Sequence, residues 1–134
     1  MLPKISKWFA PKPHPVFEHP ILGAFTFEDS IWTSRFQGVE LSIAGSDSAP
    51  NQTLLAAASA LLDRFPEIKE TALDFLVSQD GAPAREDFTC YDVELLREDS
   101  PAHFALRFIL LGDLGGIWRV EFEDGKPLFL NRDE

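Results

Sequence analysis

The sequence predicts an α+β domain with a mostly antiparallel sheet, about three strands before a helical segment and about four after it, with helices packed on one face. Short segments rich in β-branched and aromatic residues occupy residues 21–45 and 88–131, which is typical of strands. Residues 52–80 instead show apolar residues at helical spacing. The chain has 134 residues, 45% of them hydrophobic, which suffices for one domain with a real core.

Residues 1–20 are expected to form a proline-rich extended arm, distinct from a single domain formed by residues 21–134. Five prolines between positions 3 and 20 fix φ and remove backbone donors, which disfavours a helix or a central strand. Trp8 and Phe9 make the arm too apolar for a solvated linker. The arm therefore packs on its own domain or joins two copies into a homo-oligomer.

Three strands are predicted at 21–28, 31–37 and 39–45, because β-rich segments are separated there by short polar turns. In the third segment apolar and polar residues alternate, which is the period of a strand with one buried face. This order favours three consecutive antiparallel strands.

Helical spacing begins at Leu54 and resumes after Pro66, which suits a first helical position. The pattern indicates two helices, or one kinked helix, ending before Gly81. Ser48 or Asn51 is the candidate N-cap.

Four further strands are predicted at 88–96, 103–111, 117–123 and 127–131. The last two are separated by Asp124-Gly125, which is a strong hairpin signal. Gly112, Gly115 and Gly116 lie between two of these strands, and no lysine, hydroxyl residue or helix follows them. Phosphate-binding loops need those features, so the glycines are interpreted as a turn.

Charge and cysteine content limit the class of protein. The formal net charge is −10, and the first 19 residues carry three lysines against one glutamate, which leaves −12 on the remainder. Such a charge disfavours binding to nucleic acid or to anionic membranes. One cysteine cannot form an internal disulfide. No secretory signal and no run of about 18 apolar residues is present, which favours a cytoplasmic protein.

No catalytic, cofactor or metal site is predicted. Cys90 and His103 could act as nucleophile and base only if neighbouring strands brought them together, and a buried, inert cysteine is the better interpretation. His14 and His19 lack the helical spacing of a zinc site.

Acidic residues are the main candidate for function. The predicted partner surface combines the aromatic pair of the arm with six acidic residues. Its members are Trp8, Phe9, Asp92, Glu94, Glu98, Asp99, Glu121 and Glu123. The preferred hypothesis is a non-enzymatic module that binds a basic protein, for instance as an immunity-like antagonist of a basic toxin. The alternative is a hydrolase or a small-ligand protein that uses the clustered carboxylates.

Leu22-Gly23-Ala24-Phe25, then Trp32, then Gly38-Val39-Glu40-Leu41 form a pattern that resembles small bacterial domains of unknown function, family 2262 and its relatives. The resemblance covers most of residues 20–128. It implies a compact α+β module, and some of the relatives look like accessory or immunity-type proteins. It implies no established activity.

Overall fold

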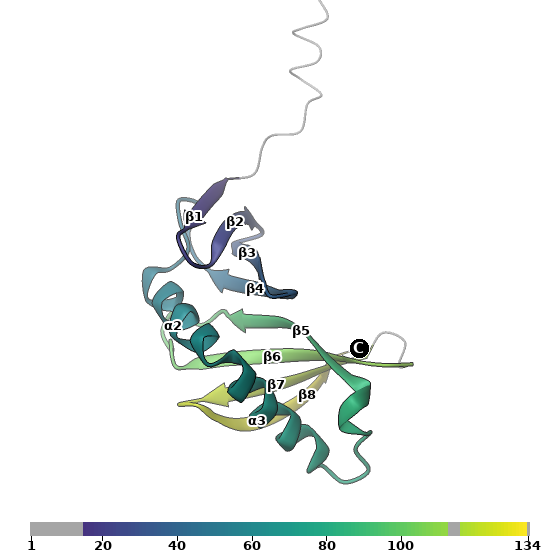
Figure 1. Ribbon diagram of the computed structural model, residues 1–134. Helices are drawn as coiled ribbons and strands as arrows, with labels where there is room; N and C mark the ends of the chain where they lie inside the picture. The colour runs from purple at the N-terminus through teal and green to yellow at the C-terminus, as the bar shows by residue number, and fades with distance from the viewer. Residues whose placement is uncertain (1–14, 113–115, 134) are drawn as a thin grey trace, which may run out of the picture.

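The computed structural model describes residues 15–112 and 116–133. These residues form one eight-stranded sheet and two α-helices (Figure 1). The strands lie side by side in the order in which they occur in the chain. Their bounds are β1 (Val16–His19), β2 (Gly23–Glu28), β3 (Ile31–Phe36), β4 (Val39–Ala44), β5 (Phe88–Leu95), β6 (His103–Leu110), β7 (Ile117–Glu123) and β8 (Lys126–Asp133). The helices are α2 (Gln52–Asp63) and α3 (Phe65–Val77), and a 3₁₀ turn, η1 (Arg85–Asp87), precedes β5.

The predicted fold class, an α+β domain with a mostly antiparallel sheet and helices packed on one face, is wrong. The described strands form one continuous mixed sheet, which holds far more of the chain than the two helices do. β4 and β5 are parallel, with Glu40 opposite Asp92, whereas the other neighbouring strands are antiparallel. The physical reason is the crossover, because α2 and α3 return the chain to the end at which β4 began. The two expected strand groups therefore share one sheet.

Three tight turns join the strands on either side of the crossover. At Asp124 and Gly125, φ is 51° and 78°, so both central residues of the β7–β8 hairpin have positive φ. This conformation matches the right-handed twist of the flanking strands, and it confirms the hairpin expected there. Asp29-Ser30 and Gln37-Gly38 also have positive φ, between β2 and β3 and between β3 and β4.

β1 is a short edge strand that sequence reasoning did not anticipate, because prolines crowd this part of the chain. Pro15 and Pro20 flank the strand and do not interrupt it. Phe17 lies opposite Phe25 in β2, and the Phe27 N–H donates to the Pro15 carbonyl at 3.1 Å. Proline at the end of an edge strand costs no ladder hydrogen bond.

The helices begin where local chemistry favours them. Asn51 is the N-cap of α2, since its side-chain oxygen accepts the Leu54 N–H at 3.0 Å. Arg64 separates the two helices, and Pro66 occupies the first turn of α3, where its missing N–H leaves no hydrogen bond unmade. The prediction of two helical segments meeting at this proline is confirmed. The change of direction there forms a corner that is important for the site described below.

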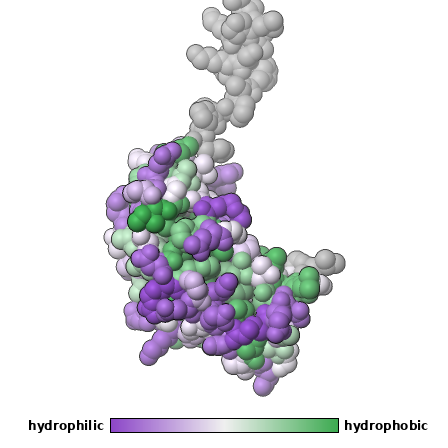
Figure 2. Space-filling view, in the orientation of Figure 1, coloured by the Kyte–Doolittle hydropathy of each residue, from purple (hydrophilic) through white to green (hydrophobic). Residues whose placement is uncertain are grey.

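One face of the sheet carries the core, and we call the other the polar face. On β6, Phe104, Leu106 and Phe108 join a cluster with buried residues from both helices, whereas Arg107 lies on the polar face. The core is aromatic, and its largest fully buried side chain is Trp32. α2 contacts β4, and α3 contacts β7 and β8. In Figure 2, hydrophobic side chains reach the surface in patches between hydrophilic ones over the helix side of the molecule.

Candidate binding site

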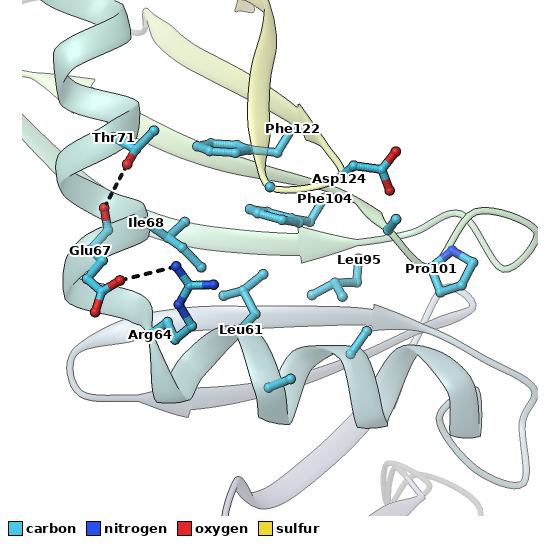
Figure 3. Close-up of a pocket in the computed structure, with 14 residues that line it drawn as sticks. Leu61, Arg64, Glu67, Ile68, Thr71, Leu95, Pro101, Phe104, Phe122 and Asp124 are labelled. Carbon is cyan, nitrogen blue, oxygen red and sulfur yellow. Dashed lines mark hydrogen bonds and ion pairs between the residues drawn. The ribbon is translucent and has the colours of Figure 1, made fainter.

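A cavity of about 400 Å³ lies between the corner of the two helices and the adjacent ends of three strands (Figure 3). α2 and α3 form two of its walls, and the ends of β5 and β6 and the β7–β8 hairpin form the others. Its volume falls within the range of roughly 300–1,000 Å³ that ligand pockets usually have. The cavity exists because the chain turns at Arg64, so that the two helices meet the sheet from different directions.

The inner surface of this cavity is apolar. Phe104 and Phe122 are paired across β6 and β7, and their rings stack with centroids 4.7 Å apart and planes inclined by 12°. Both rings point toward the helices in Figure 3. Leu61 of α2 and Ile68 of α3 face them. Small side chains on α2, including Ala60, leave the space between the helix and the rings unfilled. The cavity can therefore receive an aliphatic or aromatic group.

The rim of the cavity is charged. Arg64 Nη2 lies 3.2 Å from Glu67 Oε2, and the two side chains are 69% and 71% exposed. Exposed pairs of this kind are weak, because water screens both charges. Asp124, in the β7–β8 turn, also lines the cavity, and its carboxylate lies apart from the Arg64–Glu67 pair in Figure 3. A positively charged group at the rim would be favoured.

The predicted partner residues Glu98 and Asp99 do not line this cavity but belong to a connection that does. They are exposed in the connection between β5 and β6, and the same connection supplies Pro101 and Ala102 to the cavity wall. In the described part of the chain, no ion pair joins Glu98, Asp99 or Asp124 to a cation. Acidic charge is therefore available on this side of the molecule.

Asp92 and Glu94, also predicted as partner residues, lie instead within an ion-pair network on the polar face. Asp92 is 1% exposed, and its Oδ2 accepts a hydrogen bond of 2.7 Å from Arg107 Nη2. Glu94 Oε1 lies 3.4 Å from Nε of both Arg107 and Arg119. Burial alone would lower the pKa of Arg107, but the hydrogen bond and the charge of Asp92 outweigh it and raise that pKa above its ordinary value. These carboxylates are neutralised from within the chain.

Glu121, a third predicted residue, belongs to the same face. Its Oε1 lies 3.1 Å from His103 Nε2 and 3.9 Å from Arg97, and its Oε2 accepts a hydrogen bond from Asn131. Glu123, two residues after Glu121 in β7, is half-buried. A cavity of about 130 Å³ is lined by Glu94 and Glu121 together with His103. This volume is well below that of ordinary ligand pockets, and basic groups already engage both carboxylates.

The structure separates the other pair considered from sequence. Cys90 lies opposite Phe108, on the core face of β5, whereas His103 points to the polar face of β6. Burial raises the pKa of the Cys90 thiol to about 12, so the thiol stays protonated at neutral pH. His19 Nδ1 accepts the backbone N–H groups of Ile21 and Leu22, which is a turn-stabilising role. No group of three metal-ligating side chains occurs among the described residues.

Several sequence-predicted features fall where placement is not described. His14, Trp8 and Phe9 precede residue 15, and Gly115 lies in the gap between residues 112 and 116. The glycine-rich segment as a whole connects antiparallel strands β6 and β7. The cavity itself was missed by sequence reasoning. The only signal for it is that Phe104 and Phe122 each belong to the apolar set of an alternating strand.

Comparisons with protein-family models, with curated proteins and with solved structures find no match to this chain. The resemblance to family 2262 therefore stays a prediction. No helix among the described residues is long and apolar enough to cross a membrane.

Proposed function

We propose that this protein is a non-enzymatic module that binds a basic protein partner, and that an apolar side chain of the partner enters the cavity at the helix corner. The observation that carries the proposal is the combination of a stacked phenylalanine floor with a charged rim of two carboxylates and one guanidinium. Protein interfaces gain most of their affinity from a few anchors seated in such pockets. An immunity-type antagonist of a basic protein would be one module of this kind.

Charge supports a basic partner. Glu98 and Asp99 are exposed in the connection that supplies Pro101 and Ala102 to the cavity wall, and neither they nor Asp124 form an ion pair with another described residue. A net charge of −10 also favours encounter with cationic surfaces through long-range attraction. The carboxylates of the polar face contribute little to such attraction, because arginines neutralise them at short range.

Two matched variants test the role of the cavity. Ala60 and Ala56 are both exposed on α2, four residues apart, but only Ala60 lines the cavity. We expect Ala60→Trp to fill the cavity and Ala56→Trp to leave it open. The probe is a fluorescein-labelled peptide with one tryptophan flanked by two lysines on each side, and the readout is fluorescence anisotropy. Ala60→Trp should weaken binding at least tenfold, whereas Ala56→Trp should bind like the wild type.

Charge reversal tests the rim. Glu98→Lys with Asp99→Lys should weaken binding of the lysine peptide more than Asp80→Lys with Glu86→Lys, which changes the net charge equally at exposed sites in the connection between α3 and β5. A peptide with glutamates in place of the lysines should not bind. Circular dichroism must show that every variant is folded. Equal binding by Ala60→Trp and Ala56→Trp, or equal binding of the two peptides, would refute the proposal.

A further inference from the structure

The sequence of this chain contains one segment with the chemistry that the cavity selects. Lys4, Lys7 and Lys12 surround Trp8 and Phe9, and no acidic residue occurs before Glu18. Residues 1–14 lie outside the described part of the structure. The rest of the chain carries the opposite charge, and the rim of the cavity is acidic. Charge and apolar content of the two parts are therefore complementary.

We infer that the cavity binds the segment 4–12 of a second copy of this chain, with Trp8 against the Phe104–Phe122 pair and the lysines near the carboxylates of the rim. This inference rests on the proposed function, and it assigns the basic partner to one segment of a second copy, although each copy as a whole carries a net charge of −10. A reciprocal exchange of arms between two copies uses the same surface twice, which is the geometry of a closed two-fold dimer.

The cavity offers an indole what it needs. Tryptophan buries a large apolar area and also carries an N–H that usually finds an acceptor. The stacked rings of Phe104 and Phe122 supply the apolar surface, and Glu67, which also lines the cavity, has one carboxylate oxygen that is not bonded to Arg64. Phe9 would add apolar contact at the mouth of the cavity, but its side chain has no N–H that could donate a hydrogen bond. Trp8 is therefore the residue that we assign to the interior.

Distance favours a second copy over the chain's own cavity. β1 is the edge strand of the sheet, several strands away from β5, β6 and β7 (Figure 1). Residues at the ends of those three strands line the cavity. Strands are spaced about 4.8 Å apart, so five steps from β1 to β6 span roughly 24 Å. The seven residues from Trp8 to Pro15 reach about 23–25 Å when fully extended. An arm in its own cavity would have no slack, whereas an arm from a second copy has no such limit.

The test measures mass and exchange with full-length variants. We expect the wild type to be a dimer by multi-angle light scattering at concentrations of tens of micromolar, and Trp8→Ala and Ala60→Trp each to raise the dimer dissociation constant at least tenfold. His14→Ala, outside the segment, and Ala56→Trp, outside the cavity, should remain dimers. Mixing Trp8→Ala, which keeps its cavity, with Ala60→Trp, which keeps its arm, should restore a one-to-one complex.

Three outcomes would overturn the inference. A dimer that persists in both Trp8→Ala and Ala60→Trp would place the interface elsewhere. A monomeric wild type in which Trp8→Ala increases affinity for the lysine peptide would place the arm in its own cavity. A monomeric wild type whose peptide binding is blocked by Ala60→Trp but unaffected by Trp8→Ala would exclude the arm and leave the proposed function standing. If the peptide binds neither the wild type nor Trp8→Ala, the proposed function fails too.

Discussion

Replacing Arg107 with methionine should destabilise the protein strongly, because it would leave a buried carboxylate without its cation. Asp92 is 1% exposed, its Oδ2 receives the Arg107 hydrogen bond at 2.7 Å, and its Oδ1 has no hydrogen-bond partner among the described residues. Removing one partner of a buried ion pair typically costs about 3–5 kcal/mol. For a domain of this size, that loss corresponds to a fall in melting temperature of roughly 10–20 °C.

Urea denaturation provides the measurement, and two variants provide the comparison. Asp92→Asn with Arg107→Met removes both charges, so it should recover a large part of the stability that Arg107→Met alone loses. Arg64→Met breaks the exposed pair with Glu67, and it should cost no more than about 1 kcal/mol. Arg107→Met and Arg64→Met each remove one arginine from an ion pair. A difference between their free energies of unfolding therefore reports the effect of burying the carboxylate partner.

Two results would refute this reasoning. If Arg107→Met cost no more than Arg64→Met, Asp92 could not be held in a water-excluded site. If the double variant were as unstable as Arg107→Met, the loss would come from packing of the long side chain and not from the orphaned carboxylate. Arg107 also lies 5.2 Å from the Tyr91 ring centroid, so part of the packing loss would then be assigned to that contact.

Two further predictions concern single residues. Cys90 in the folded protein should resist iodoacetamide at pH 8 and react once the protein is unfolded. Burial raises the pKa of the Cys90 thiol to about 12 in the folded protein. The contribution of this thiol to stability is therefore complete below the ordinary thiol pKa and is lost as the pH rises from about 9 to about 12. The free energy of unfolding should therefore fall more steeply over that window in the wild type than in Cys90→Ala, and parallel curves would contradict this. Asn51→Ala should lower the free energy of unfolding by about 1 kcal/mol through loss of the α2 cap, whereas Ser48→Ala should change it little in the same urea assay.

Local chemistry made several elements of this fold predictable. The Asp124-Gly125 hairpin, the break between the helices at Pro66 and the alternation in β4 each depend on residues close together in sequence. Asn51 was one of two candidate caps, and the structure selects it because its side chain reaches the Leu54 N–H. Such features depend on residues that are close together in sequence, so the sequence alone is enough to predict them.

The parallel pairing of β4 and β5 could not be predicted in the same way. Glu40 and Asp92 are opposite each other but more than fifty residues apart in the chain. Whether a strand after a helical segment joins the sheet in parallel depends on how the crossover returns, and local periodicity carries no information about this. β1 was missed for a different reason, since Pro15 and Pro20 disfavour strands in their interior but are compatible with strand ends.

For the site, the sequence indicated acidic residues but not their environments. Asp92 and Glu98 are six positions apart and look alike in sequence, yet one is buried against Arg107 and the other is exposed beside the cavity. The difference arises from the strand period: Asp92 and Glu94 fall on the polar face of β5, where β6 and β7 place their arginines opposite. Glu98 lies beyond the end of the strand, and no described residue of a neighbouring strand forms an ion pair with it.

This distribution of charge connects the stability of the sheet with the proposed binding role. On the polar face, the arginines of β6 and β7 compensate carboxylates that would otherwise be costly to bury, so that face is held together internally. The residues Glu98, Asp99 and Asp124 lie where strands end, and no other described residue forms an ion pair with them. An apolar cavity opens at the same end of the sheet, which places the available charge and the available apolar surface together. The basic aromatic segment proposed above would use both, and neither the polar face nor the core of the described residues offers that combination.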